Sequence, residues 1–408
     1  MHPVLLTLPF PDVPLPLLPA LLAVSLLGFG LSVYAHILRR TGLRTFGLAS
    51  GVTAGAAGWA FRHQTLTLAK LEVPAYGTAL GLALICGWGL TLRLASPPPR
   101  LERQLQDTLV VSAVCGLLAS RASFVLVSSD RFPELEFLAL RQGGLLGMGA
   151  LLGGLLGAYL FCRQLALDFW QWLDWVAPGF VLGTALVRVG CYLNGCGYGV
   201  PLAENAPGWL SALGRFPRWQ DPVDGPIEGS AAWLQQVVQG RLEPEATWTH
   251  PVHPVQLYEA VGALGLLLFA WLLTRRRLPT GQTGLAIVFG YVMLRFVVEA
   301  FRGDIERGLW GPSLHPAVLL GIGLLLFAAA FAYGPATSLP TGRVRIGALL
   351  ACLVPAASFA LLMRHHATPT QPSLSQWLAL LAAGWTAHGW VQVTRKQRPT
   401  ATFQKLTS

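Results

Sequence analysis

The stretch from Arg188 to Gly199 combines a cation, two thiols, an amide and four glycines at the end of a long apolar segment. A guanidinium group grips phosphate oxygens through two parallel hydrogen bonds and keeps its charge. A thiol becomes a nucleophile or a metal ligand once it ionises. Ionisable groups at a membrane edge are costly unless they face a cavity or a partner, so this stretch is predicted to bind or to react with a polar ligand.

Further ionisable residues are predicted at the same membrane depth. The segment 253–259 opens the next apolar run, and Arg295, Glu299 and Arg302 lie on the run after it or at its end. The spacings i,i+4 and i,i+3 place these three on one helical face. One interpretation is an internal ladder of salt bridges. We favour a phosphate site, because several arginines, among them Arg188, converge at one depth.

The composition indicates which elements position these residues. Hydrophobic residues make up 53% of the 408 residues and charged residues only 12%, whereas a soluble chain carries about a quarter charged residues. Repeated apolar runs of about 20 residues predict a polytopic, all-α membrane protein. The net charge of +10 is scattered over short loops, which favours lipid head groups and argues against nucleic acid.

We predict about 9–11 transmembrane helices. Met1 to Ala20 lacks a basic region and contains six prolines, so the first span is expected to stay in the membrane. Arginine and lysine are concentrated in one set of alternate loops, which places Arg188 and the long segment 191–255 on the extracytoplasmic side. That segment is predicted to be a small extramembrane domain or a functional cap. The candidate spans are 15–36, 45–61, 75–92, 107–127, 143–162, 170–189, 256–274, 282–301, 315–334, 346–363 and 374–393.

Three further features lie in the apolar runs. A glycine-rich run begins with Gly143 and Gly144 and allows close helix packing, or lets backbone amides reach an anion. Asp107 and Arg121 bracket one span and share a helical face. Tyr76, at the outer end of its span, is by itself typical of an aromatic belt.

Taken together, these motifs resemble the prolipoprotein diacylglyceryl transferases in order and spacing. The resemblance covers roughly residues 72–335, and it implies a seven-helix membrane core, with extra spans in 1–71 and 336–408. The matching motifs are Tyr76-Gly77, Asp107 with Arg121, Gly143 to Gly154, Arg188 to Gly199, His253 to Glu259, and Gly290 to Arg302.

The resemblance implies a transferase that moves a diacylglyceryl group from phosphatidylglycerol to the lipobox cysteine of a bacterial prolipoprotein. The product is a thioether, and glycerol phosphate is released. The implied partners are phosphatidylglycerol, the prolipoprotein signal peptide with its lipobox, and membrane lipids, with no cofactor, metal or nucleic acid. The implied location is the bacterial inner membrane, as a multi-pass protein whose site faces the extracytoplasmic side.

The resemblance also suggests roles for individual residues. Arg188 and Arg295 are assigned to the phosphate, and Tyr76 and His253 complete the catalytic candidates. The substrate-binding candidates are Arg188, Asn194, Gly199, Tyr258, Glu259, Glu299, Arg302, Arg121, Gly143 and Gly144.

Three positions depart from the pattern of the family. Met148 stands where the family usually has a histidine, Cys191 where it has asparagine, and Cys196 where it has glutamate. His253 is then the nearest motif histidine that can accept the thiol proton. Alternatively, it fixes the loop before a proline-started helix, and the arginines alone lower the pKa of the substrate thiol.

The two cysteines admit three interpretations. They are small filler residues, an extracytoplasmic disulfide, or a lipid-accepting or redox pair, and we favour the first two. Two other functions remain open for the chain as a whole. One is a divergent paralogue with another acceptor, and the other is a non-catalytic phospholipid-binding or transport protein.

Overall fold

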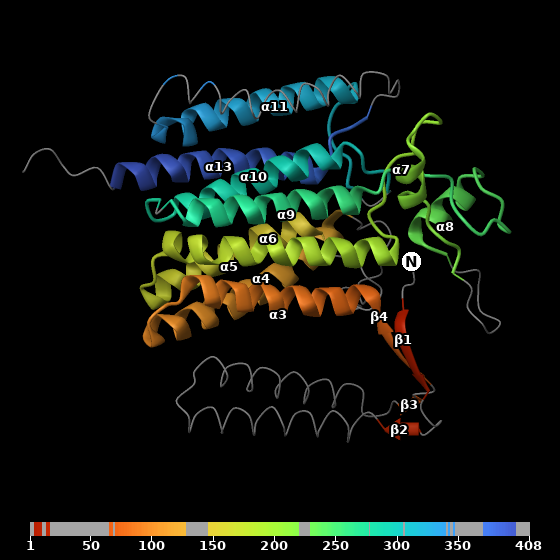
Figure 1. The fold of residues 1–408 in the computed structure, drawn as a ribbon, viewed down its shortest axis with the longest axis horizontal. Helices are drawn as coiled ribbons and strands as arrows, with labels where there is room; N and C mark the ends of the chain where they lie inside the picture. Colours follow the sequence, from red (N-terminus) through yellow and green to blue (C-terminus); the bar gives the residue numbers. More distant parts are fainter. Residues whose placement is uncertain are drawn as a thin grey trace, which may run out of the picture.

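The protein is largely helical, as its apolar runs predicted. Seven helices in the described part of the chain are long and apolar enough to cross a membrane, which confirms a polytopic membrane protein. They lie side by side in Figure 1. They are α3 (Ala75–Ala95), α4 (Pro99–Val127), α5 (Gly147–Leu165), α6 (Phe169–Asn194), α9 (Val255–Thr274), α10 (Gln282–Glu299) and α11 (Pro316–Tyr333). The computed structural model describes residues 4–9, 14–16, 65–67, 70–127, 146–219, 229–276, 278–304, 307–339, 342, 346 and 370–396.

The ends of these helices follow from local sequence. α4 begins at Pro99, earlier than the predicted 107, because proline favours the first helical position and the polar residues after it continue the helix beyond the apolar run. α6 begins after Asp168, whose side chain accepts a hydrogen bond from the Trp170 amide at 2.9 Å. It ends at Asn194, and Gly195, whose φ of 70° is left-handed, caps it. The predicted spans 15–36, 45–61 and 346–363 lie outside the described residues, apart from positions 15, 16 and 346; positions 15 and 16 belong to a short strand, Pro14–Pro16, and not to a helix.

Glycines bring neighbouring helices into close contact. α3 packs on α6, and α4 packs on α5. A Cβ added to Gly87 would lie 2.8 Å from the Gly179 carbonyl oxygen, and one added to Gly116 would lie 2.9 Å from the Ala150 oxygen. Small residues therefore set the spacing of both pairs, which agrees with the packing interpretation of the glycine-rich run.

A further helix, α13 (Leu374–Lys396), lies between α10 and α11 in Figure 1. The predicted span 374–393 is thus helical, but it is not among the seven described helices that are apolar enough to cross a membrane. Together with α6, these three helices enclose an aromatic core in which the rings of Phe296 and Phe327 are 5.5 Å apart. The largest buried side chains of this core include Trp172, Phe289, Phe296, Phe327 and Trp390.

The predicted extramembrane segment contains two short helices, α7 (Gly208–Leu213) and α8 (Ala231–Val238). Both lie beyond one end of the bundle in Figure 1. Phe216 and Trp233 are fully buried there, and the Trp233 indole donates to the Ala246 carbonyl at 2.8 Å. The segment therefore has a small core of its own. Near the start of α3, β1 (Val4–Pro9) pairs antiparallel with β4 (Lys70–Pro74), and β2 (Pro14–Pro16) pairs with β3 (Thr65–Thr67).

Candidate functional site

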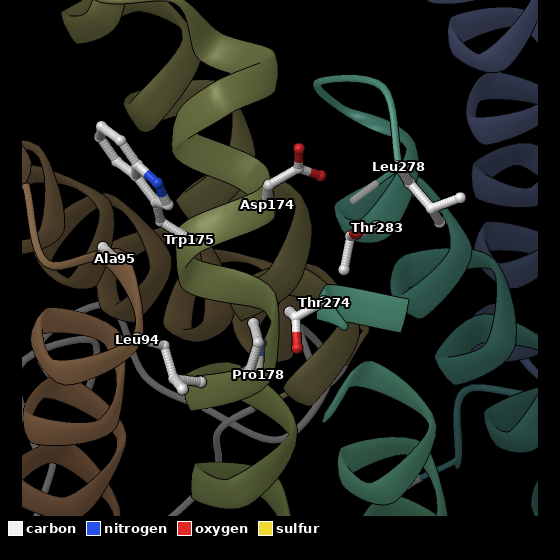
Figure 2. Close-up of a pocket in the computed structure, with 8 residues that line it drawn as sticks. All are labelled: Leu94, Ala95, Asp174, Trp175, Pro178, Thr274, Leu278 and Thr283. Atoms are coloured by element: carbon white, nitrogen blue, oxygen red, sulfur yellow. The ribbon is translucent and has the colours of Figure 1, made fainter. Parts of the chain in front are cut away.

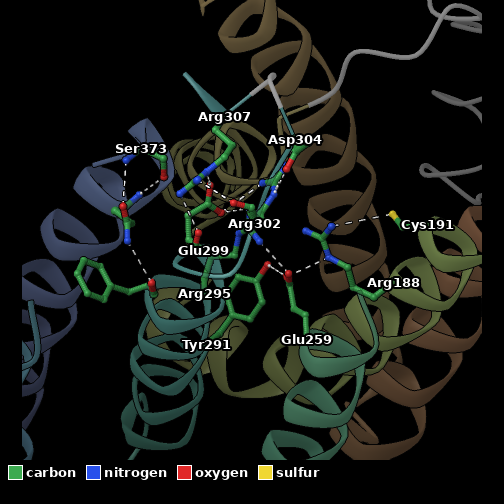
Figure 3. A network of polar contacts seen from close by, with 12 residues as sticks. Arg188, Cys191, Glu259, Tyr291, Arg295, Glu299, Arg302, Asp304, Arg307 and Ser373 are labelled. Atoms are coloured by element: carbon green, nitrogen blue, oxygen red, sulfur yellow. Dashed lines mark hydrogen bonds and ion pairs between the residues drawn. The ribbon is translucent and has the colours of Figure 1, made fainter. Parts of the chain in front are cut away.

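Glu259 joins two arginines from different helices (Figure 3). Its Oε1 lies 3.0 Å from Arg188 Nε, and its Oε2 lies 2.8 Å from Arg295 Nη1. The Tyr291 hydroxyl donates to Oε1 at 3.4 Å. The Glu259 side chain is only 1% exposed, so its charge requires these partners. The predicted convergence of Arg188, Glu259 and Arg295 at one depth is therefore confirmed.

Glu299, the last residue of α10, joins three arginines. Its Oε2 lies 2.7 Å from Arg295 Nη2 and 3.2 Å from Arg302 Nη1, and its Oε1 lies 3.5 Å from Arg307 Nε. The salt-bridge ladder expected from the i,i+4 and i,i+3 spacings is thus formed. It continues through Arg295 to Glu259, so the ladder and the convergent arginines are parts of one network. We call Arg188, Glu259, Arg295, Glu299, Arg302, Asp304 and Arg307 the ion network.

Asp304 and Arg307 extend the network into the loop after α10, and sequence reasoning missed both as site residues. Asp304 pairs with the Arg302 guanidinium, and Arg307 Nη1 donates to the Arg302 carbonyl at 2.8 Å. Burial disfavours the charge of Arg302, but the carboxylates of Glu299 and Asp304 outweigh burial and hold the pKa of Arg302 above its usual value. The only signal in the sequence was the close spacing of acidic and basic residues from 299 to 307.

Backbone pairing between three loop segments fixes Arg302. The Gly199 amide donates to the His253 carbonyl at 3.0 Å, and Gly199 also bridges to Arg302. The Val200 amide donates to the Phe301 carbonyl at 2.8 Å. A Cβ on Gly199 would lie 2.5 Å from the His253 carbonyl oxygen and 2.8 Å from the Phe301 oxygen. Gly199 is therefore required because the backbones approach one another there.

His253 is held by the first turn of α9 and by the end of α10. Its Nδ1 lies 3.1 Å from the Tyr258 hydroxyl, and its ring centroid lies 5.0 Å from that of Phe301. The structure therefore connects both candidates, His253 and Tyr258, to the loop that carries Arg302. The same contacts also fit the alternative in which His253 fixes the loop before α9.

The Arg188 side chain is 17% exposed, whereas those of Glu259 and Arg295 are only 1% and 4% exposed. Its Nη1 lies 4.0 Å from the Cys191 sulfur. A Cβ on Gly147 or on Gly197 would lie 3.9 Å from the guanidinium nitrogens. Gly147 begins α5, and the residue before it supplies no side-chain cap. The guanidinium is thus bordered by glycine backbone and by the positive end of a helix dipole.

Cys191 and Cys196 are free thiols, so the disulfide alternative is not formed. The Cys196 thiol donates to the Cys191 carbonyl at 3.7 Å, and the Gln256 side chain donates to the Cys196 carbonyl at 2.7 Å. The contact with the Cys191 thiol, together with burial, raises the pKa of Cys196 well above its usual value. Asn194 is the last residue of α6, so this candidate residue lies at the turn that follows the helix.

The remaining candidates have varied surroundings. Tyr76 begins α3 beside α6, where a Cβ on Gly190 would lie 3.5 Å from the Tyr76 Cα. Arg121 is buried in α4, with its guanidinium 5.5 Å from the Phe124 ring centre. Met148 is 2% exposed and belongs to the hydrophobic core. Gly143 and Gly144 lie outside the described residues. Within the described ranges, we find no cluster of three metal-ligating side chains.

A pocket opens at the opposite end of the bundle from Arg188 (Figure 2). Asp174 lines it, but its carboxylate accepts the Gly281 amide at 2.5 Å and the Gly284 amide at 2.7 Å. These bonds cap the start of α10, so the role of Asp174 there is structural. The other lining residues are Leu94, Ala95, Trp175, Pro178, Thr274, Leu278 and Thr283.

A sequence model of the prolipoprotein diacylglyceryl transferase family matches residues 63–334 of this chain. The chain belongs to this family. It is 32% identical over 287 residues to the phosphatidylglycerol–prolipoprotein diacylglyceryl transferase of Azoarcus sp. (strain BH72), across 66% of this chain and 96% of that protein. The enzyme of the same name from Chromobacterium violaceum is 30% identical over 286 residues, across 65% and 95%. That from Finegoldia magna is 26% identical over 259 residues, across 63% and 88%.

Membership of the diacylglyceryl transferase family confirms what the motifs predicted. The whole ion network lies within the matched residues 63–334. α13 lies beyond them, although it packs directly on α10. The part of this chain that matches the family therefore packs against a helix that the family model does not include.

Proposed function

We propose that this protein transfers the diacylglyceryl group of phosphatidylglycerol to the cysteine thiol of a prolipoprotein. The main support for this function is that Glu259 bridges Arg188 and Arg295 in a chain that belongs to the transferase family. Two guanidiniums held at fixed separation stabilise negative charge on a departing phosphate without reorganising during the reaction.

Arg188 is the arginine that contacts the lipid phosphate. It is more exposed than Arg295, and only Glu259 forms an ion pair with it among the described residues. The glycines at the start of α5 and after α6 leave room beside its guanidinium. A phosphate there meets both a cation and the positive end of a helix. Arg295 forms ion pairs with both Glu259 and Glu299. It positions Glu259 and adds positive electrostatic potential to the site.

The reaction is a displacement at carbon. The prolipoprotein sulfur bonds to the glycerol carbon of the diacylglyceryl group, and the bond between this carbon and the phosphate oxygen breaks. The electron pair leaves with glycerol phosphate, and the thiol proton passes to a base or to solvent. His253 is the proposed base, because Met148 lies in the apolar core and has no basic group. Its contact with Tyr258 orients the ring.

The site faces the extracytoplasmic side of the bacterial inner membrane. Basic residues are concentrated in the loops at the opposite end of the bundle, including Arg93 at the end of α3, Arg163 at the end of α5 and Arg275 after α9. Such loops stay in the cytoplasm. The lipobox then approaches Arg188 from the side on which α7 and α8 lie.

Complementation tests this function. A bacterium depleted of its own transferase is expected to regain mature lipoprotein mobility when it produces this protein. The purified Arg188→Ala variant is expected to lose about 10²–10³-fold in transfer from phosphatidylglycerol to a lipobox peptide, since it lacks one charge-stabilising donor. Near-normal transfer by both Arg188→Ala and Arg295→Ala would contradict the assignment of these arginines to the phosphate.

One observation favours a second candidate, transfer to a different acceptor. Met148 is buried, and Cys191 and Cys196 occupy the positions where the family usually has asparagine and glutamate. The Cys191 sulfur lies 4.0 Å from Arg188 Nη1, and Met148 follows Gly147, which borders the same guanidinium. Consumption of phosphatidylglycerol by the purified protein without modification of any lipobox peptide would decide for this candidate.

A further inference from the structure

The pocket at the end of the bundle opposite the ion network encloses about 150 Å³. Its walls come from the last turns of α3 and α9, the first half of α6 and the start of α10 (Figure 2). At 1.5 Å per residue, α3 and α9 are each about 30 Å long, which matches the hydrocarbon core of a bilayer. The pocket therefore lies where the head groups of one leaflet begin.

Most of the pocket wall is apolar. The apolar lining residues are Leu94, Ala95, Trp175, Pro178 and Leu278. Leu94 is 44% exposed, so the pocket reaches the surface of the protein. Water gains few hydrogen bonds from such a wall, whereas the glycerol backbone and the upper methylenes of a lipid bury apolar surface there.

The polar groups of the wall suit a ligand that carries ester or hydroxyl groups. The Asp174 carboxylate is already occupied, because its two oxygens accept the amides of Gly281 and Gly284. Pro178 lies one turn after Asp174 within α6 and has no N–H, so the Asp174 carbonyl loses its usual helical donor. This carbonyl and the Thr283 hydroxyl, whose residue also lines the pocket, can both bond to a polar ligand.

Arginines border the pocket on two sides. Arg93 precedes the lining residue Leu94 in α3, and Arg275 follows the lining residue Thr274 after α9. Both arginines are exposed, and neither forms an ion pair with a described carboxylate. The Arg275 guanidinium lies 3.6 Å from the centre of the Trp271 ring, a pair typical of the head-group level. Arginines at helix ends also balance the helix dipole and set the topology, but neither role requires a pocket between them.

We propose that this pocket binds one anionic phospholipid of the leaflet opposite the ion network. Arg93 and Arg275 supply positive charge to its phosphate from α3 and α9, and its glycerol backbone enters the pocket beside α6. The bound lipid ties both helices to α6, which carries Arg188 at its other end. It is a structural ligand that is not consumed, so the proposal does not depend on the transferase reaction.

Thermal unfolding in detergent micelles tests this site. The micelles contain phosphatidylcholine or, at the same mole fraction, phosphatidylserine, which is anionic but lacks the glycerol head group that the proposed reaction releases. We expect phosphatidylserine to raise the Tm of the unmodified protein by about 2–4 °C relative to phosphatidylcholine. The double variant Arg93→Gln/Arg275→Gln should lose most of this rise. Arg163→Gln is the matched control and should keep it, because exposed Arg163 ends α5 and lies 5.9 Å from the Tyr159 ring centre, away from the pocket.

A second variant separates the pocket from surface charge. Ala95→Phe fills the pocket and leaves both arginines in place, so it should also lose the rise in Tm. A full rise in Ala95→Phe, an equal loss in Arg163→Gln, or no rise in the unmodified protein would overturn the proposal. The same rise with inorganic phosphate alone would assign the site to a free anion and would also overturn it.

Native mass spectrometry gives a readout that does not depend on Tm. In the same micelles, the unmodified protein and Arg163→Gln should retain one more molecule of phosphatidylserine than the Arg93→Gln/Arg275→Gln variant. Equal numbers of retained lipids in all three proteins would contradict the site.

Discussion

The carboxylate of Glu259 lies 3.0 Å from the Nε of Arg188, although α9 and α6 bring the two residues from distant parts of the sequence. The other oxygen of the same carboxylate is bound by Arg295. Arg188 therefore cannot be moved without disturbing Arg295, and the two cations act as one unit.

Glu259→Gln is expected to cost both stability and activity. The change leaves two guanidiniums without their shared counter-charge, and breaking a buried ion pair in this way costs about 3–5 kcal/mol. Thermal unfolding in detergent and transfer to a lipobox peptide measure the two effects. Glu204→Gln is the control, because Glu204 is exposed and undergoes the same chemical change. Equal behaviour of the two variants would contradict the shared role of Glu259.

Lysine substitutions are expected to distinguish the role of Arg188 from that of Arg295. Arg295 uses two different nitrogens for Glu259 and Glu299, and a lysine cannot span both carboxylates. Arg295→Lys should therefore lower both Tm and transfer. Arg188→Lys should lower transfer with a smaller change in Tm, because its side chain is 17% exposed. The opposite order of the two Tm values would argue against the division of roles.

Gly199→Ala is expected to weaken the junction of three loops. The added methyl would press against the His253 and Phe301 backbone, and overpacking of this kind costs about 1–3 kcal/mol. The displacement should also move Arg302 and lower transfer. At Gly208, by contrast, an added Cβ meets nothing within 4 Å, so Gly208→Ala should leave Tm and transfer unchanged. A loss confined to Gly208→Ala would be inconsistent with the observed packing.

The Cys196 thiol is expected to resist alkylation near neutral pH. The contact with Cys191 and burial raise its pKa well above the usual value, and only the thiolate reacts with N-ethylmaleimide. Because the thiolate fraction falls as the pKa rises, labelling should be slow at pH 7.5 and should increase as the pH is raised. Peptide mass spectrometry of the native and the denatured protein measures the difference. Equally fast labelling of both at pH 7.5 would contradict a raised pKa of the native thiol.

The sequence predicted the spans and the ladder because both depend on local spacing. Apolar runs define where a helix crosses the membrane, and the contacts of Glu299 with Arg295 and Arg302 follow from helical geometry. The start of α4 at Pro99 was missed, since a helix can extend beyond the apolar run into polar residues. Hydrophobicity reports the membrane boundary, whereas capping and propensity determine the helix end.

Other parts of the site depend on contacts between distant segments. Arg188 and Glu259 were predicted at one depth, but no periodicity indicates which cation a carboxylate selects. Asp304 and Arg307 lie in a loop, where side-chain direction follows from tertiary contacts. α13 begins far along the chain, and its position depends on how it packs against α10.

α13 follows the whole ion network in the sequence, so the ribosome synthesises it after every charged residue of that network. Until α13 docks, the loop after Arg307 lacks the backbone hydrogen bonds that join Leu374 to Gly308 and Trp310 to Pro372. A chain truncated before α13 therefore contains all the charged groups of the ion network but lacks this support for the loop.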